Sequence, residues 1–193
     1  MKNLNELSKE VHKNAVGKGF WDTHKSSFHC IMLAITELSE AIEADRKNKH
    51  SDILKFEEEI EIDHVFKIGK VYDSMFKNAF EEYIKGSVEE EIADAFIRLL
   101  DLAGERDMKL FVETKIIKEF KIGTHGWSFC ELIYFICKGL LDSAQYTSRQ
   151  ESIRLTLTRL YVISDLLSFD LDKHVEYKMQ YNSTRERMHG KLY

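Results

Sequence analysis

The chain has 193 residues, a formal net charge of −5 and no proline. That length is enough for one domain, or two small ones, to bury a substantial core. The acidic balance argues against a nucleic-acid-binding protein, which would carry a basic surface. Because proline interrupts helices, its absence favours long helices and an all-α fold.

The sequence has no stretch with the character of a membrane or export segment. Its apolar runs fall short of the roughly 18 residues that a membrane span needs. The opening stretch MKNLNELSKE lacks the apolar centre of a secretory signal. Cys30, Cys130 and Cys137 lie in apolar helical patterns without metal-ligand spacing, which predicts reduced core residues. We therefore expect a cytoplasmic protein with no membrane partner.

A first helix is expected over residues 3–16, and the glycines at 17 and 19 end it. The turn that follows, residues 18–22, presents Phe20 and Trp21. Adjacent aromatic rings in a glycine-flanked turn can stack on a flat ligand, and they can also pack against a helical bundle. From these residues alone, packing is the simpler interpretation.

A second helix is expected over residues 26–46, and it carries Glu37 and Glu40 one turn apart on one face. These acids are surrounded by small apolar residues, which is unusual for a solvated face. Buried acids usually need partners or a metal ion, so the pair is a candidate metal site. The apolar stripe on the other side comprises Phe28, Ile31, Ile35, Leu38 and Ile42.

Residues 53–72 break the helical rhythm. Their E-I-E-I and V-F-K-I-G-K-V-Y runs alternate with period two, so a short β-hairpin or an irregular insertion is expected there. Such a hairpin could form a flap over a site. Helical spacing then returns with Met75, Phe76, Phe80 and Ile84.

A further helix is expected to start at Ser87, which forms the capping-box pattern S-x-x-E with Glu90. It carries a second pair of acids one turn apart, Glu91 and Asp94. The helix dipole alone also favours acids in a first turn, so two interpretations stay open. Two acid-bearing helices laid side by side would bring four carboxylates together, and oxygen-only ligands suit Mg²⁺. The expected core side comprises Val88, Ile92, Ala95, Phe96 and Leu99.

The sequence after residue 107 resembles its own first half. Residues 26–46 match residues 126–145 in apolar pattern, and residues 107–116 match residues 170–179. We expect a single all-α bundle domain with a degenerate internal duplication, a first repeat over about residues 20–116 and a second over about 125–188. Two unrelated amphipathic helix pairs would give a weaker version of the same match. In this register the four acids are replaced by Lys138, Leu141, Arg154 and Leu157.

The last helix, expected over about residues 173–188, aligns four polar or aromatic side chains along one face. Two cations and an amide on one face suit contact with phosphates. A solvated surface stripe is the simpler alternative. The four residues are Lys178, Tyr181, Asn182 and Arg185.

Together these motifs resemble the all-α nucleoside triphosphate pyrophosphatases, the superfamily of MazG, the dimeric dUTPases and phosphoribosyl-ATP pyrophosphatase. The segments NAVGKGFWD, ELSEAIEADR, EEIADAFIRLLDLA and KMQYNSTRERMHGK are similar to one MazG-like branch nearly end to end. The shared pattern is E-x-x-E followed by E-x-x-D, here Glu37, Glu40, Glu91 and Asp94.

The resemblance implies that the four acids are catalytic residues that bind Mg²⁺, with Mn²⁺ as a substitute. The ions would hold a nucleoside triphosphate and activate a water for attack at the α-phosphorus, releasing pyrophosphate and a nucleoside monophosphate. It implies that Lys178, Asn182 and Arg185 face the phosphates. Tyr181 belongs to the same substrate-binding face, and Trp21 becomes a candidate base-stacking residue.

Two features depart from the usual MazG-type pattern. Fifty residues separate Glu40 from Glu91, so the segment 47–75 is an insertion of unknown role. Glu89, Glu90 and Glu91 are consecutive, so Glu90 competes with Glu91 as a metal ligand or water-activating base. The second repeat could complete the site within one chain, and a homodimer stays open. The sequence does not specify the base or sugar of the substrate.

Two alternatives belong to other classes of protein. A di-iron carboxylate bundle uses E-x-x-H pairs, and the chain has Glu61 with His64 and Glu186 with His189. The first pair lies in the alternating segment and the second at the end of the last helix, so both are poorly placed. A non-catalytic nucleotide-binding regulator is the other alternative, and the intact set of four acids argues against it.

Overall fold

The computed structural model describes residues 3–62, 70–146 and 149–190. Regular structure in these ranges is helical throughout, so the all-α prediction is confirmed. The elements are α1 (Leu4–Gly17), α2 (Ser27–Arg46), α3 (Ile53–Ile62), α4 (Lys70–Tyr83), α5 (Val88–Glu105), α6 (Thr114–Gly123), α7 (Phe129–Tyr146), α8 (Arg149–Leu166), α9 (Leu171–Thr184) and the short η2 (Arg187–Gly190).

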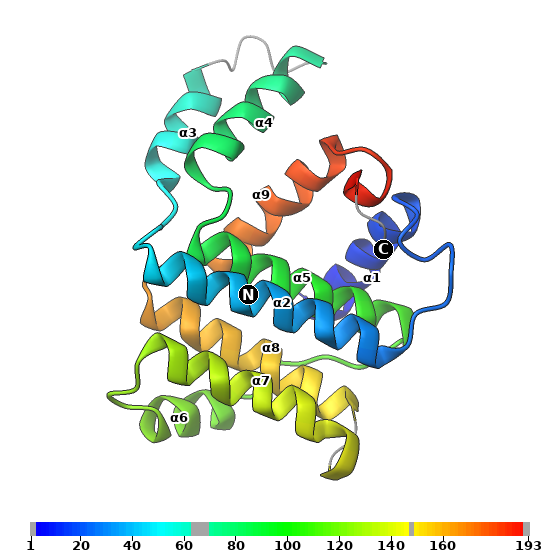
Figure 1. Ribbon diagram of the computed structural model, residues 1–193, viewed down its shortest axis with the longest axis vertical. Coiled ribbons are helices and arrows are strands. Elements are labelled where there is room, and N and C mark those ends of the chain that lie inside the picture. Colours follow the sequence, from blue (N-terminus) through cyan, green and yellow to red (C-terminus); the bar gives the residue numbers. More distant parts are fainter. Residues whose placement is uncertain (1–2, 63–69, 147–148, 191–193) are drawn as a thin grey trace.

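Helices α2 and α5 pack against each other through the middle of the molecule (Figure 1). Helices α1 and α9 pack on α5, and the α7–α8 pair packs on the α2–α5 pair from below. Helix α6 contacts α8, whereas α3 and α4 form an arm that reaches the rest of the bundle through α9. The two acid-bearing helices predicted from the sequence are therefore neighbours.

Helix α5 is buried on almost every side, which makes it the central helix of the fold. Ser87 caps its first turn by accepting a hydrogen bond from the backbone N–H of Glu90 at 3.2 Å, as the capping pattern predicts. Near its other end, a Cβ at Gly104 would collide with the backbone oxygen of Ser8 and with His12, so α1 crosses there at close range. The five residues expected on its core side are all fully buried: Val88, Ile92, Ala95, Phe96 and Leu99.

Helix α2 is buried on two sides. Most of its predicted stripe lies in the core or packs against it, namely Ile31, Leu38, Ile35 and Ile42, whereas Phe28 is 55 % exposed. On the side that carries the acids, Ala41 is fully buried and Glu37 is 4 % exposed. The short side chains allow α2 and α5 to approach closely, which buries Glu37 while Glu40, one turn later, stays exposed.

The hairpin expected over residues 53–72 is wrong where the structure describes it. Residues 53–62 form α3 and residues 70–72 begin α4, whereas residues 63–69 lie outside the described part. The E-I-E-I run is too short to fix a period, and Phe56 and Ile60 also lie on one helical face. That face belongs to a second hydrophobic cluster, built around Phe56, Phe76, Ala79, Phe80, Ile84 and Tyr181.

The internal duplication stays a prediction. Helices α2 and α5 form one packed pair, α7 and α8 form another, and the pairs contact each other through α2 with α7 and α5 with α8. This arrangement is what two stacked repeats would give. Across the described residues, none of the helices combines the length and the apolar character needed to cross a lipid bilayer.

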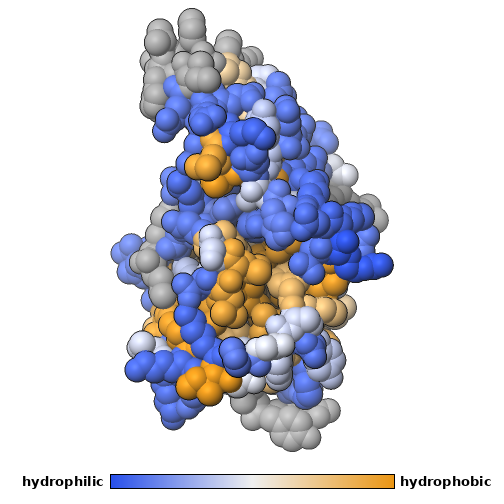
Figure 2. All heavy atoms as spheres, turned by 90° about the vertical axis from the view of Figure 1, so that its left-hand side faces the viewer, coloured by the Kyte–Doolittle hydropathy of each residue, from blue (hydrophilic) through white to orange (hydrophobic). Residues whose placement is uncertain are grey.

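The surface combines polar and hydrophobic areas. Figure 2 shows hydrophobic side chains gathered in the middle of one side face, with polar side chains around them. Among the large hydrophobic residues that are exposed, Tyr134 and Leu141 lie on α7 and Leu166 ends α8. Exposed apolar area of this kind can be covered by a partner, and the homodimer that the sequence leaves open stays a prediction.

Candidate functional site

Three of the four predicted acids come together between α2 and α5. Glu37, Glu40 and Glu91 each place one carboxylate oxygen so that these oxygens lie within 4.8 Å of one another. Glu37 and Glu91 are buried, whereas Glu40 is exposed and opens the group to solvent. The spacing within each helix was visible in the sequence, and the packing of α2 on α5 joins the two pairs. We call these three residues the acid group.

In the acid group, burial and the negative charge of neighbouring carboxylates disfavour the ionised form of Glu91. Burial, followed by the neighbouring charge of Glu90, raises the pKa of Glu91 to about 9. Asp94 and Glu40 act in the same direction, and Lys178 opposes them. A buried carboxyl in such surroundings favours either a bound proton or a bound cation.

Arg98 joins the acid group to the rest of α5. Its Nε and Nη2 atoms lie 3.0 Å and 2.9 Å from Oε1 of Glu37. Burial opposes its charge, but Asp94 and Glu37 outweigh burial and raise the pKa of Arg98. The guanidinium therefore stays charged and forms an ion pair with Glu37.

The fourth predicted acid, Asp94, lies against a buried lysine. Its Oδ2 atom is 2.9 Å from Nζ of Lys178, which also forms an ion pair with Glu90. Burial opposes the lysine charge, but the carboxylates of Asp94 and Glu90 outweigh it and raise the pKa of Lys178. The predicted phosphate-facing Lys178 is thus 5 % exposed and neutralises acids of its own chain.

The three consecutive glutamates have three different sets of partners. Glu89 accepts hydrogen bonds from the backbone N–H of Ser51 at 2.9 Å and lies 2.8 Å from Nδ1 of His50. Glu90 pairs with Lys178 and accepts a hydrogen bond from the backbone N–H of Gly86 at 2.8 Å. Glu91 alone joins the acid group, so of Glu90 and Glu91 it is Glu91 that lies beside Glu37 and Glu40.

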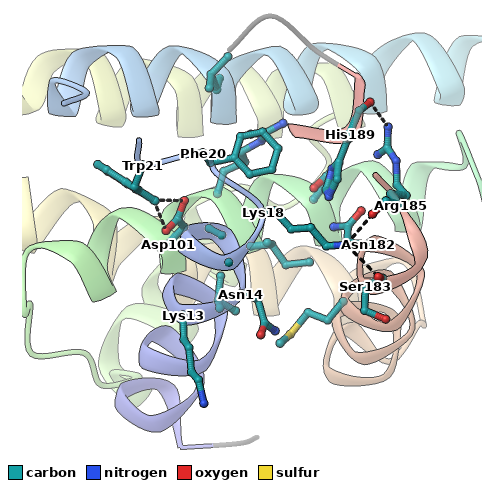
Figure 3. Close-up of a pocket in the computed structure, with 18 of the residues that line it drawn as sticks. Lys13, Asn14, Lys18, Phe20, Trp21, Asp101, Asn182, Ser183, Arg185 and His189 are labelled. Atoms are coloured by element: carbon teal, nitrogen blue, oxygen red, sulfur yellow. Dashed lines mark hydrogen bonds between the residues drawn. The ribbon is translucent and has the colours of Figure 1, made fainter. Parts of the chain in front are cut away.

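A cavity of about 440 Å³ lies beside the acid group, between the end of α1, helices α2 and α5, and the end of α9 (Figure 3). Asp94 and Arg98 line this cavity and also contact Lys178 and Glu37, so the cavity and the acid group share a wall. The volume is in the range of small-molecule sites.

Trp21 lines the cavity with its indole held in place. Its Nε1–H donates to Oδ1 and Oδ2 of Asp101, at 2.9 Å and 3.1 Å. Nδ1 of His12 lies 2.8 Å from the same carboxylate, and the His12 ring meets the indole edge-on at 5.3 Å. Burial raises the pKa of Asp101, although these hydrogen bonds oppose the shift. A fixed aromatic ring in a cavity wall suits stacking on a flat ligand, and that role of Trp21 stays a prediction.

Positive charge is concentrated around the cavity although the chain as a whole is acidic. Five lysine or arginine residues line it, compared with the acids Asp94 and Asp101. Lys18 also donates hydrogen bonds to the backbone oxygens of Ser183 and Arg185, at 2.9 Å and 2.5 Å, and so ties α1 to the end of α9. The cationic lining residues are Lys13, Lys18, Lys25, Arg98 and Arg185.

The four residues of the predicted stripe on α9 lie in three different environments. Asn182 and Arg185 line the cavity, whereas Lys178 lies among the acids. Tyr181 is 3 % exposed, stacks on Phe80 at 4.3 Å and donates its hydroxyl hydrogen to Glu81 at 2.7 Å. Positions i, i+3, i+4 and i+7 do share one helical face, but α9 packs against both α5 and α4, and Arg185 lies just past the end of the helix. The members of that face therefore meet different neighbours, and Tyr181 is a core residue in this structure.

Sequence reasoning did not place His189 or Lys18 at the site. The backbone N–H of Met188 donates to the backbone oxygen of Lys18 at 2.8 Å, and this contact brings η2 back onto the cavity. His189 packs edge-on against Phe20 at 5.0 Å. Burial, with the charge of Arg185 adding to it, lowers the pKa of His189 to about 3. No local spacing in the sequence signals a contact between the two ends of the chain.

The described residues of the second half lack an equivalent site. Arg154, which corresponds to Glu91 in the predicted duplication, pairs with Glu113 and Glu151 at 2.7 Å and 2.5 Å. Among the described residues, the acid group is the one cluster of this kind that could hold a metal ion. Of the E-x-x-H pairs, Glu61 and Glu186 are exposed, and His64 lies outside the described residues.

Comparisons with protein-family models, with curated proteins and with solved structures find no significant match to this chain. The chemistry of the site therefore rests on its own residues.

Proposed function

We propose that this protein is a Mg²⁺-dependent nucleoside triphosphate pyrophosphohydrolase, acting in the cytoplasm on a free ribo- or deoxyribonucleotide. The observation that carries the proposal is the acid group opening beside a cavity lined by five cationic residues and two aromatic rings. A triphosphate needs metal ligands and positive charge, and a nucleoside needs an apolar cavity with flat surfaces. Both requirements meet at one place in the fold.

The donor set fits a hard divalent cation. Glu37, Glu40 and Glu91 offer only carboxylate oxygens, from two helices, within 4.8 Å. Such ligands suit Mg²⁺, and Mn²⁺ as a substitute. Asp94 lies one turn after Glu91 on the same helix and is the natural fourth ligand once Lys178 turns toward a phosphate. When bound, the metal would neutralise phosphate charge and activate a water for attack at the α-phosphorus.

The residues of the chain itself would bind and orient the nucleotide. Arg98 and Arg185 line the cavity with permanent charge, which suits phosphate oxygens. The Trp21 indole, fixed by Asp101, offers a rigid face for a base. In the reaction the water oxygen bonds to the α-phosphorus, the bond from that phosphorus to the bridging oxygen breaks, and pyrophosphate leaves.

The resemblance of the motifs to the MazG-like pyrophosphatases supports the same reaction class. The chain carries the motifs E-x-x-E, E-x-x-D and K-x-x-x-N-x-x-R in that order, and they begin at Glu37, Glu91 and Lys178. In the structure these three positions lie on α2, α5 and α9, around the acid group and the cavity. The proposal therefore needs no residue from outside this region.

The test is pyrophosphate release from a panel of ribo- and deoxyribonucleoside triphosphates, with Mg²⁺ and with EDTA. We expect metal-dependent release by the wild type and a loss of about 100-fold in Glu40→Gln, because a ligand is removed from an exposed position with little effect on folding. Glu43→Gln is the matched control, since Glu43 is an exposed acid on the same helix that pairs with Arg46 and Lys47. Release that is insensitive to EDTA, or unchanged in Glu40→Gln, would contradict the proposal.

A non-catalytic nucleotide-binding bundle is the second candidate, and one observation favours it. The Lys178 ammonium contacts both Glu90 and Asp94, which offsets the negative charge that a metal would need. Saturable binding of a triphosphate with no pyrophosphate released at any Mg²⁺ concentration would decide for this candidate.

A further inference from the structure

Two polar atoms in the cavity wall are buried with no hydrogen-bond partner among the described residues. They are Oδ1 of Asn182 and Nε2 of His189. Buried side-chain polar atoms are nearly always hydrogen-bonded, so each exception calls for an explanation. Both residues line the same cavity, which places two unsatisfied groups within reach of one ligand.

The segment that carries His189 is held in a strained conformation. Met188 and His189 both have left-handed backbone angles, with φ of 50° and 53°. Such angles are uncommon for residues other than glycine, and they persist where surrounding contacts enforce them. Here the contacts are the hydrogen bond from Met188 to Lys18 and one from Nη2 of Arg185 to the backbone oxygen of His189 at 3.1 Å. These contacts therefore hold the backbone at unfavourable angles and keep the imidazole at the cavity.

The two residues line the same cavity as Asp94, which borders the acid group, and as the aromatic ring of Trp21. Asn182 is one helical turn beyond Lys178, which contacts Asp94 near the acid group. On α5, Asp101 lies two turns beyond Asp94, about 10 Å along the axis. Figure 3 shows Asn182 and His189 on one side of the cavity and Trp21 with Asp101 on the other. A ligand that extends from Asp94 to Trp21 would occupy the cavity that these two residues line.

The chemistry of the two atoms favours a hydroxyl over a phosphate as their common partner. An amide oxygen is an acceptor, and phosphate oxygens are acceptors too. The imidazole is neutral, so it offers no charge to an anion. A hydroxyl group can donate to Oδ1 and can also donate to or accept from Nε2, so it satisfies both. In a nucleotide, the hydroxyl groups belong to the sugar, which lies between the phosphates and the base.

We propose that Asn182 and His189 are specificity-determining residues that hydrogen-bond the sugar hydroxyls of the bound nucleotide. This inference rests on the proposed function for its ligand and deepens it by naming the part of the substrate that each residue contacts. It also changes the expected role of Asn182 from phosphate contact to sugar contact.

The test compares kcat/KM for the ribo-, 2′-deoxy- and 2′,3′-dideoxynucleoside triphosphates of one base. In Asn182→Ala and in His189→Asn, kcat/KM should fall about 10-fold for a substrate that keeps the recognised hydroxyl. It should stay unchanged for the dideoxynucleotide. Loss confined to the ribonucleotide assigns the 2′-hydroxyl, and loss shared by the ribo- and deoxynucleotide assigns the 3′-hydroxyl. Asparagine tolerates the left-handed backbone at position 189. Glu186→Ala, an exposed residue next to η2, should leave all three values unchanged.

A second measurement separates this inference from the proposed function. Shifts of the unfolding midpoint by the same three triphosphates in EDTA report binding without turnover. If the wild type binds but releases no pyrophosphate, the proposed function fails, while loss of the hydroxyl-dependent shift in the two variants still supports the sugar contact. Equal losses in the variants on all three sugars, by either readout, would overturn it. Without nucleotide, Asn182→Ala should unfold at the wild-type temperature or above, because it removes an unsatisfied atom.

Discussion

At the scale of single residues, the Lys178 ammonium forms ion pairs that help to join α9 to the acid-bearing helix α5. It is 5 % exposed and pairs with both Glu90 and Asp94. Removal of one partner from a buried ion pair leaves uncompensated charge, which is far more unfavourable than the pair itself. The same ammonium lies close enough to the acid group to oppose the raised pKa of Glu91.

We therefore expect Lys178→Met to lower the free energy of unfolding by ~3–5 kcal/mol, measured by chemical denaturation. Lys85→Met is the matched control, since Lys85 forms an exposed pair with Glu81 at 3.8 Å and should contribute less than about 1 kcal/mol. Adding Glu90→Gln to Lys178→Met should recover part of the loss. If both lysine variants lowered the free energy of unfolding equally, this prediction would be contradicted.

At the scale of elements, the α3–α4 arm has a hydrophobic core of its own. Phe56 meets Phe76 at 5.4 Å and Tyr177 of α9 at 4.8 Å, both edge-on. Tyr181 extends this cluster from α9 by stacking on Phe80. The arm therefore docks through aromatic contacts on α9, the helix that also carries Asn182 and Lys178.

Phe56→Ala should loosen this arm more than the rest of the bundle. Truncation of a buried phenylalanine typically lowers stability by ~3–5 kcal/mol, and here the lost contacts are confined to α3, α4 and α9. Hydrogen exchange should rise across α3 and α4 and stay low in α5. Leu54→Ala, at a 70 % exposed position on the same helix, provides the control. A uniform rise across all helices would mean that the arm and the bundle unfold as one unit.

At the scale of the whole molecule, buried histidines couple stability to pH. Burial lowers the pKa of His174 from 6.5, although the backbone of Asp170 and the charge of Glu89 oppose the shift. Nε2 of His174 lies 3.0 Å from Oγ of Ser51, and Nδ1 lies 2.8 Å from the backbone oxygen of Asp170. The ring thus stays neutral in the fold at a pH where the unfolded chain takes up a proton.

The direction of this pH dependence follows from the number of protons that the folded and unfolded states bind. As pH falls below about 6.5 the unfolded state binds the proton first, so His174 makes the free energy of unfolding decrease with falling pH. Denaturation curves between about pH 7.5 and pH 5 should therefore show a steeper loss for the wild type than for His174→Gln. His125→Gln, at an exposed position, should follow the wild type. Parallel curves for wild type and His174→Gln would contradict this prediction.

Much of the fold and part of the site follow from short-range patterns. The periodicity of residues 88–99 predicts both the α5 helix and its buried face, and the S-x-x-E pattern predicts its cap at Ser87. The secondary structure of segment 53–72 does not follow from its pattern, because an alternating run of four residues fits a strand and a helix equally well. Its helical state was decided by the aromatic contacts of Phe56 with α4 and α9.

The sequence by itself determined the helical class and the two acid pairs, because each depends on residues within a turn or two of one another. Tertiary structure alone decided that Glu91, and neither Glu89 nor Glu90, joins Glu37 and Glu40. It also decided that η2 returns to Lys18 and brings His189 to the cavity. These contacts join residues tens to more than a hundred positions apart, and a window of about 11–18 residues carries no information about them.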